Sequence, residues 1–204
     1  QLYTYWLYDY AGVNPQNGNA LWRNEEGLLT ENYGEARRIN AGSPEPLWTG
    51  GFNTELSWKG ISLGIQLEAR YGNKVLNQDR SLFEADGSYG DSNIWKGAMN
   101  YWKKPGDTNV LPKPVYNNSS NSSAISTRYL EDGSYLRIKD ITLAYSLPSK
   151  WTKKALMSGV RIYASALNLY TFHNMNYWDP EHGTSGATII SYPMTRSMIV
   201  GVDI

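Results

Sequence analysis

The sequence predicts an all-β protein, and more narrowly an antiparallel segment of a transmembrane β-barrel with long extracellular loops. Two observations lead to this fold class. Apolar and polar residues alternate with a period of two in several runs, which is typical of strands with one apolar and one polar face. The connections between those runs alternate between long and short, as they do in barrels of the bacterial outer membrane.

The clearest pair of strands is predicted over residues 52–58 and 61–71, with a two-residue Lys-Gly turn between them. Every second residue is apolar in both runs, and the turn places Trp58 opposite Ile61, so that the two apolar faces coincide. The opposite face is polar and carries the residues that would face a barrel lumen, namely Glu55, Gln66, Glu68 and Arg70. Taken alone, this hairpin favours a soluble sandwich, because soluble sheets with the same alternation are more common than membrane barrels.

Further alternating runs complete about six predicted strands, and these lie over residues 1–8, 134–147, 160–172 and 194–204. Within the run 134–147 the apolar residues change phase at Lys139 and Asp140. Such a shift predicts a β-bulge, in which one extra residue is inserted into a strand.

The connections between these runs decide between the two kinds of sheet. The long ones cover about 9–50, 72–133 and 173–193, and the short ones cover 59–60 and 148–159. Counted back from a periplasmic C-terminus, every long connection falls outside the cell and every short one inside, which is the arrangement of outer-membrane barrels. A compact soluble domain has little use for a loop of about 60 residues. Loop parity therefore favours the membrane barrel.

The composition narrows the function classes. The 204 residues include 16 Tyr and 8 Trp but only 3 Phe, and Tyr and Trp are preferred where one end of a ring is apolar and the other is wet. Basic and acidic residues balance at 19 each, which argues against a broad electrostatic footprint for nucleic acid or for anionic lipid and leaves a local basic patch open. The absence of cysteine excludes disulfides, thiolate metal sites and cysteine nucleophiles. The sequence has no run of 18 apolar residues.

No group of residues predicts catalysis or metal binding. His173, Asp179, Glu181 and His182 lie close together, but their spacing matches no metal motif, and the segment is interpreted as a solvated loop. The acid pair Glu131-Asp132 precedes a Gly-Ser turn and is interpreted as structural. No nucleophile elbow, phosphate loop or zinc signature is present. We therefore expect no catalytic residues, no metal and no cofactor, and the protein is not expected to be an enzyme.

Residues 128–148 read RYLEDGSYLRIKDITLAYSLP, and this block resembles the SusC/RagA family of TonB-dependent transporters. Weaker blocks that resemble the family follow in the family's order, at residues 10–18, 50–60, 101–105, 160–172, 178–181 and 192–196. The resemblance covers most of the chain and implies that residues 1–204 are the C-terminal part of a barrel of about 22 strands. The plug domain of the family is not in this chain. The family usually ends in a Phe two residues beyond the position of Ile204, which leaves open a longer chain or an unusual terminus.

The resemblance also implies a function and partners. Members import glycan fragments or peptides across the outer membrane of Gram-negative, Bacteroidetes-like bacteria. The expected partners are a SusD-like surface lipoprotein that acts as a lid, TonB acting through the plug, the rest of the barrel, the lipid bilayer and an oligosaccharide or peptide substrate. The alternative is a soluble glycan-binding β-sandwich module, which shares the Trp and Tyr content and the alternation and would fold alone.

Aromatic residues fall into two predicted groups. Those in the long connections are candidates for contact with substrate or lid, because aromatic rings stack on sugars and anchor interfaces; they are Trp22, Trp48, Trp95, Tyr101, Trp102, Tyr177 and Trp178. Packing of the loops against one another is the alternative for this group. Those near strand ends and a short turn are candidates for an aromatic girdle at the membrane interface; they are Trp58, Tyr71, Tyr145 and Trp151. Ordinary core packing is the alternative for the second group.

Overall fold

The computed structural model describes residues 3–88, 93–116, 120–181, 186–188, 192 and 194–204. The chain divides into two compact units, and each is described by itself. The first, called the loop unit, comprises Gln1–Glu45, Lys74–Asp132 and His182–Ser191. The second, called the strand unit, comprises Pro46–Asn73, Gly133–Glu181 and Tyr192–Ile204.

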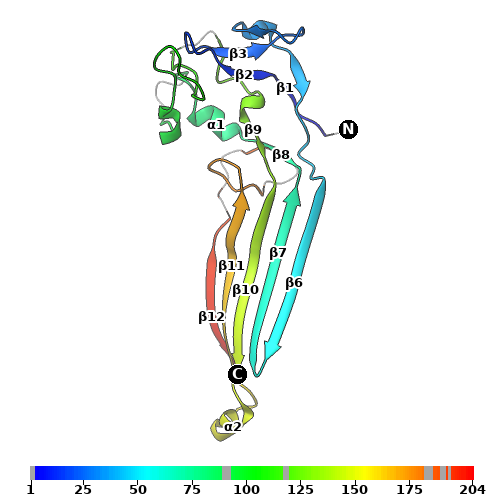
Figure 1. Cartoon of the computed structure of the whole chain (residues 1–204). Coiled ribbons are helices and arrows are strands. Elements are labelled where there is room, and N and C mark those ends of the chain that lie inside the picture. Colours follow the sequence, from blue (N-terminus) through cyan, green and yellow to red (C-terminus); the bar gives the residue numbers. More distant parts are fainter. Residues whose placement is uncertain (1–2, 89–92, 117–119, 182–185, 189–191, 193) are drawn as a thin grey trace. The chain divides into compact units, whose positions relative to one another are not determined.

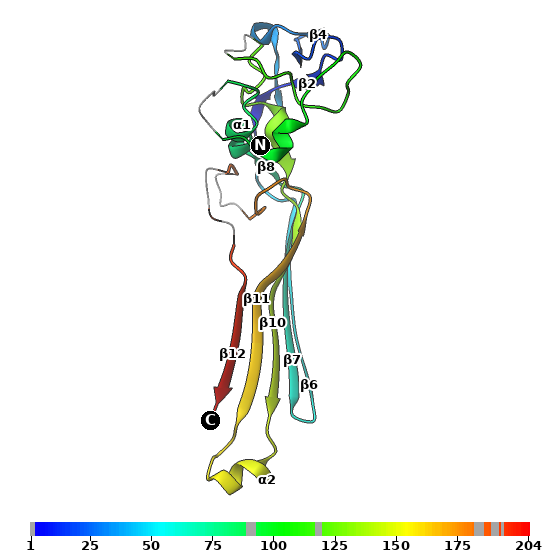
Figure 2. The same ribbon diagram turned by 90° about the vertical axis from the view of Figure 1, so that its left-hand side faces the viewer.

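The strand unit is built on one five-stranded antiparallel sheet with the order β12-β11-β10-β7-β6 (Figure 1). Its strands are β6 (Trp48–Trp58), β7 (Ile61–Tyr71), β10 (Tyr135–Ser146), β11 (Arg161–His173) and β12 (Ser197–Asp203). Each strand of this sheet pairs with the sheet strand that precedes or follows it in the sequence, so the sheet is a meander (Figure 2). Its outer strands, β6 and β12, do not pair with each other in the described part of the chain, and the sheet is open.

The first hairpin is longer than the sequence predicts. Trp58 pairs with Ile61 at the turn, which confirms the predicted register. At the other end Trp48 pairs with Tyr71, so β6 begins four residues before the predicted start at residue 52. Glycine usually weakens a strand, but at Gly50 the missing side chain leaves room for the Trp48 ring, which would lie 2.5 Å from a Cβ at this position.

A bulge interrupts β10 at the predicted position. The register shifts between Ile138 and Asp140 against both neighbouring strands, which confirms the expected phase change. On the β11 side, Asn168 has a φ of 51°, a left-handed conformation that Asn tolerates better than most residues. The bulge lets Lys139 reach the polar face, where its ammonium lies 3.0 Å from Glu68 Oε2.

The prediction that residues 1–8 add a sixth strand to this sheet is wrong. Residues 1–2 lie outside the described residues, and β1 (Trp6–Tyr8) pairs with β5 (Arg38–Asn40) in a two-stranded sheet of the loop unit. The reason is the burial of Leu7, which packs in a small apolar core with Leu76 and Tyr129. Alternation in a short aromatic run cannot distinguish this local pairing from membership of the larger sheet.

The predicted long loops carry secondary structure of their own. The loop unit has a three-stranded sheet, a second two-stranded sheet and short helices, namely β2 (Tyr10–Val13), β3 (Ala20–Arg23), β4 (Leu29–Thr30), β8 (Lys74–Leu76), β9 (Leu130–Asp132), α1 (Gln78–Phe83), η1 (Tyr33–Glu35), η2 (Lys96–Met99) and η3 (Thr127–Tyr129). The short connection of the strand unit contains α2 (Ser149–Thr152) and η4 (Lys153–Ala155). No helix in the described residues is both long enough and apolar enough to cross a membrane.

Candidate functional site: the two faces of the strand sheet

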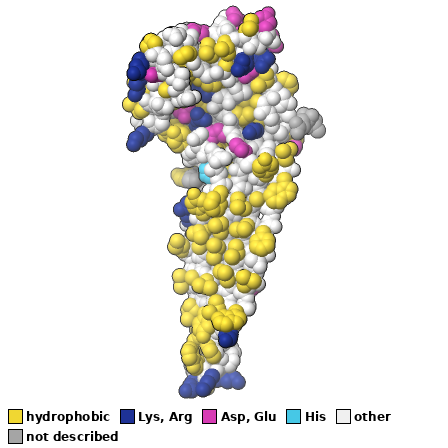
Figure 3. Space-filling view, in the orientation of Figure 1, with side chains coloured by type: hydrophobic (Ala, Val, Ile, Leu, Met, Phe, Trp, Pro, Cys, Tyr) yellow, Lys and Arg dark blue, Asp and Glu magenta, His cyan; other side chains and the backbone are white. Residues whose placement is uncertain are grey.

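One face of the strand sheet is apolar along its whole length. Residues that pair across adjacent strands form rows on this face. Paired residues of adjacent strands put Leu56, Leu63, Leu143, Ala164 and Val200 side by side across all five strands. The neighbouring rows on this face are Phe52-Leu67-Ile138-Tyr170, Thr54-Ile65-Ile141-Ala166-Met198 and Trp58-Ile61-Tyr145-Ile162-Val202. Figure 3 shows hydrophobic side chains over these strands. Side chains alternate between the faces on either side of the β10 bulge, and the bulge restores the phase, so the rows form one continuous apolar face.

The apolar face is open to its surroundings within this chain. Leu143 is 53% exposed, and Val200 is 78% exposed. A contiguous exposed apolar surface marks contact with lipid or with another apolar partner. The four predicted girdle aromatics are exposed as well: Trp58 and Tyr145 lie in the row next to the turns, Trp151 lies in α2, and Tyr71 lies at the far end of β7. Their exposure is compatible with an aromatic girdle at the membrane interface, and the girdle stays a prediction.

The opposite face is polar and carries all four predicted lumen residues. Its rows are Thr49-Arg70-Tyr135-His173, Gly51-Glu68-Arg137-Thr171, Asn53-Gln66-Asp140 and Glu55-Gly64-Thr142-Ser165. Sequence alternation placed Glu55, Gln66, Glu68 and Arg70 on one face, and the register brings them together across β6 and β7. Whether these residues meet a lumen stays a prediction.

Arg137 is the most buried charge on the polar face. Its side chain is fully buried, and its guanidinium pairs with the carboxylates of Asp179 and Glu181. Its Nε also donates a hydrogen bond of 2.9 Å to Thr171 Oγ1. A buried guanidinium needs such partners, because an unpaired charge away from water is strongly destabilising. Arg137 therefore holds the segment after β11 against the sheet.

Glu68 joins this cluster to the next strand. Tyr135 donates its hydroxyl to Glu68 Oε1 at 2.9 Å, and Arg70 Nε lies 3.8 Å from the same oxygen. The Lys139 ammonium lies 3.0 Å from Glu68 Oε2 and 3.7 Å from Glu181 Oε2. The result is a continuous charged network over β7, β10 and the segment that follows β11.

The interpretation of Asp179 and Glu181 as part of a solvated loop is wrong, because both acids are partly buried against Arg137. His182 lies outside the described residues. No cluster of three potential metal ligands occurs in the part of the chain that the structure describes. Sequence reasoning missed Arg137, although it lies in the block 128–148 that carries the family resemblance, and both acids lie in the similar block at 178–181.

A second polar group lies toward the middle of the same face. Asp140 accepts hydrogen bonds of 2.8 Å from the hydroxyls of Thr142 and Ser165. The two hydroxyl oxygens are 2.9 Å apart, so the three side chains form one closed set. A carboxylate in this position requires polar surroundings on its side of the sheet.

No family model matches the chain. Among curated proteins, TonB-dependent receptor P3 of Formosa agariphila is 31% identical over 179 residues, which cover 82% of this chain and 17% of the receptor. TonB-dependent receptor P26 of the same organism is 27% identical over 201 residues, which cover 92% of this chain and 19% of the receptor. A solved structure of the RagAB peptide transporter superposes with a TM-score of 0.83 at 30% identity, over 98% of this chain and 22% of that chain.

The chain belongs to the TonB-dependent transporters of the SusC/RagA type. It spans about a fifth of the length of the relatives it matches. The match confirms the predicted fold class, because the described sheet is an open, strand-rich segment that superposes on a barrel transporter of this type. A second RagAB structure, of the peptide importer in its open-open state, gives a TM-score of 0.82 at 29% identity.

The family block 128–148 has a physical explanation in both units. In the loop unit, Arg128 pairs with Asp86, and Arg80 pairs with Glu84 at 2.9 Å and with Glu131 at 2.6 Å. Burial alone would lower the pKa of Arg80, but the hydrogen bonds and charge of Glu84 and Glu131 raise it above its ordinary value. In the strand unit, the same block supplies Arg137. The transporter block is therefore a set of buried ion pairs rather than only a turn at the start of a strand.

The aromatics predicted to meet substrate or lid are divided by the structure. Trp22 is fully buried in the loop unit and donates its indole N–H to the Ser120 carbonyl at 3.3 Å, and Trp102 is buried and donates to the Pro15 carbonyl at 3.0 Å. Their burial favours the alternative that they pack the loops. Trp48 lies in β6 rather than in a long loop, which corrects its predicted position.

The remaining candidates are more accessible. Tyr177 is the most open of them, at 56% exposed, while Trp95, Tyr101 and Trp178 are half-buried. Trp95 stacks on Phe83 with ring centroids 4.8 Å apart. Contact of these four with substrate or lid stays a prediction.

Proposed function

We propose that this chain supplies barrel wall and extracellular loops to a TonB-driven importer in the bacterial outer membrane. The observation that carries the proposal is the opposition of the two faces of the strand sheet. The apolar face, exposed along all five strands, is suited to the hydrocarbon of a bilayer, and the polar face to a water-filled lumen. The plug on which TonB acts is expected outside residues 1–204.

The alternative of a soluble glycan-binding sandwich has weaker support. Such a module buries one face of each sheet against the other, so its apolar rows would be covered. In the described part of the strand unit, no second sheet covers the apolar rows, and side chains such as Met198 and Val202 are exposed. An open edge at β6 also requires a further strand as its partner.

The proposed cargo class is glycan fragments or peptides, and two observations favour peptides. The solved structure with the TM-score of 0.83 is a peptide transporter. The polar face also carries charges of both signs within a few ångströms, as around Glu68 and Lys139, which suits the amides and termini of peptides better than neutral sugars. We propose that a SusD-like lipoprotein closes the transporter from outside and contacts exposed residues of the long connections, Tyr177 among them.

Membrane fractionation and uptake assays test the proposal. Both use the full-length protein expressed from its own gene. We expect it in the outer-membrane pellet, released only by detergent. Cells should take up fluorescently labelled oligopeptides when TonB is present, and uptake should fall to background in a TonB deletion or after deletion of the gene. Recovery of the protein as a soluble monomer that binds sugar would contradict the proposal.

A further inference from the structure

Unpaired positive charge gathers at the end of the strand sheet where the short turns lie. Lys59 lies in the turn between β6 and β7, and Lys150, Lys153 and Lys154 lie in the connection between β10 and β11. The two turns adjoin each other, because the Ser146 N–H donates to the Gly60 carbonyl at 2.8 Å. Figure 3 shows Lys and Arg side chains gathered at this end of the unit.

These lysines have no acidic partner in the described residues. All four are exposed, and none of them forms an ion pair with an acid of the described residues. Two acids lie toward this end: Asp203 is paired with Arg161 at 3.4 Å, and Glu55 lies on the polar face and has no ion pair with these lysines. The Lys59 ammonium instead lies 4.7 Å from the centre of the Trp58 ring, which holds it at the border of the apolar face.

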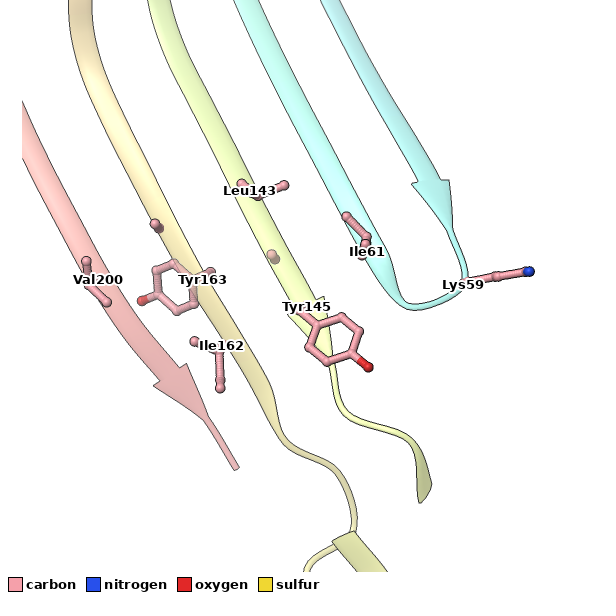
Figure 4. Close-up of a pocket in the computed structure, with 9 residues that line it drawn as sticks. Lys59, Ile61, Leu143, Tyr145, Ile162, Tyr163 and Val200 are labelled. Carbon is pink, nitrogen blue, oxygen red and sulfur yellow. The ribbon is translucent and has the colours of Figure 1, made fainter. Parts of the chain in front are cut away.

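An apolar groove begins beside Lys59 and runs along the apolar face. Its volume is about 670 Å³, and its walls are Ile61, Leu143, Tyr145, Ile162 and Val200 (Figure 4). The groove exists because β11 carries an alanine in register between two large residues: Ala164 pairs with Leu143 on one side and Val200 on the other. In Figure 4 the Tyr145 hydroxyl lies at the turn end of the groove, and the Lys59 side chain starts at the turn and points outward from it.

An apolar groove lined at one end by Lys59, at an end of the sheet that carries three more exposed lysines, fits an amphiphile with an anionic head. We propose that this end of the strand sheet binds an anionic phospholipid, with one acyl chain in the groove over Ala164 and the phosphate beside Lys59. A small soluble anion would leave the groove empty, and a zwitterionic lipid would bring its own ammonium close to the lysines. The inference rests on the placement of the strands in a bilayer and is independent of cargo and lid.

Lipid titration of the detergent-solubilised receptor, followed by native mass spectrometry, tests the charge requirement. The probes are dioleoyl phosphatidylglycerol and dioleoyl phosphatidylcholine, which share their acyl chains and differ in net charge. Each lysine near an anionic surface is worth about fivefold in affinity, so Lys59→Glu/Lys153→Glu should weaken phosphatidylglycerol binding at least ~20-fold and leave phosphatidylcholine binding unchanged. The matched control is Lys103→Glu/Lys104→Glu, an exposed pair in the loop unit, which should bind both lipids as the unmodified receptor does.

A second variant tests the groove. Ala164→Phe fills the groove from an exposed position, so it should reduce the affinity for both lipids about tenfold without preventing folding, since an apolar residue replaces an apolar residue. Each variant is first tested for folding: a folded barrel should stay folded in detergent that has not been heated. Equal affinity of the unmodified receptor for the two lipids would overturn the proposal, as would an equal loss in the Lys103/Lys104 control. Unchanged binding in Ala164→Phe would overturn the placement of the acyl chain.

Discussion

The loop unit and the strand unit both bury paired charges but distribute their apolar side chains in opposite ways. The loop unit buries apolar and aromatic side chains such as Trp22 and Leu7, as a protein in water does. The strand unit buries the guanidinium of Arg137 and leaves Leu143 and Val200 exposed. Both units follow the same rules of hydrophobic burial and charge pairing, so the difference is one of solvent. The apolar side chains of the strand unit need an apolar environment from outside the chain. Those of the loop unit pack against one another.

The largest expected effect comes from the buried charge of the strand unit. Arg137→Leu removes the guanidinium that Asp179 and Glu181 share, leaves Glu181 only the longer contact with Lys139, and should destabilise the unit by about 3–5 kcal/mol. Arg161→Leu is the matched control, because its pair with Asp203 is largely exposed and should be worth less than about 1 kcal/mol. Urea unfolding in lipid vesicles measures both. An equal loss of unfolding free energy in the two variants would show that the buried ion pairs of Arg137 stabilise the unit no more than the exposed pair of Arg161.

The buried indole of the loop unit gives the next effect. Trp22→Ala removes a fully buried side chain that meets the rings of Tyr10 and Tyr33 at 5.5 Å and 5.1 Å, and should cost about 3–4 kcal/mol. Tyr116→Ala, at an exposed position of the same unit, should stay within about 0.5 kcal/mol. Proteolysis of intact cells from outside reports opening of the loops. A Trp22→Ala variant as resistant as Tyr116→Ala would show that Trp22 is not a core residue.

A charge on each face sharpens the comparison within the sheet. Leu143→Arg places a guanidinium on the apolar face and should cost about 2–4 kcal/mol of assembled barrel. Thr142→Arg, one residue away on the polar face, gives up the hydrogen bonds of Thr142 but places its guanidinium beside the Asp140 carboxylate, so it should cost less than half as much. The fraction of folded protein in outer-membrane extracts measures both, and a larger loss for Thr142→Arg would reverse the assignment of the faces.

High pH should weaken the loop unit, and this is the smallest expected effect. Burial raises the pKa of Tyr10 from 10.0 to about 12, although the charge of Arg128 opposes the shift. A raised pKa means that the stabilising contribution is fully present below about pH 10 and is lost as the pH rises toward about 12, because the unfolded chain ionises first. Protease protection of the loops at pH 11.5 relative to pH 9 measures it. Tyr10→Phe should lose less protection than the unmodified protein over this interval, and an equal loss would contradict the assignment.

Local patterns predicted what is local in this fold. Alternation and a two-residue turn placed Trp58 opposite Ile61, and a single phase change located the bulge at Lys139. The polar face of β7 followed from the same period of two. These features depend on residues a few positions apart, so the sequence contains all the information they need.

Contacts between distant residues were not predictable in this way. Arg137 and Asp179 are 42 residues apart, and no spacing rule connects a strand arginine to an acid in a later connection. The burial of Trp22 depends on the Ser120 carbonyl, 98 residues away, so its ring was assigned to an exposed loop. Trp48 was missed as a strand residue because Gly50 and Gly51 follow it. In each case tertiary packing overrode a correct local rule.

Cysteine labelling of neighbouring residues tests the central claim, that the two faces of the strand sheet lie in different solvents. The 204 residues contain no cysteine, so Gln66→Cys on the polar face and Leu67→Cys on the apolar face each introduce one thiol into this part of the protein. In intact outer membranes, a charged water-soluble maleimide should label Gln66→Cys, and an uncharged lipid-soluble maleimide should label Leu67→Cys. Labelling of both positions by the charged reagent would contradict the account, because the apolar rows would then face water.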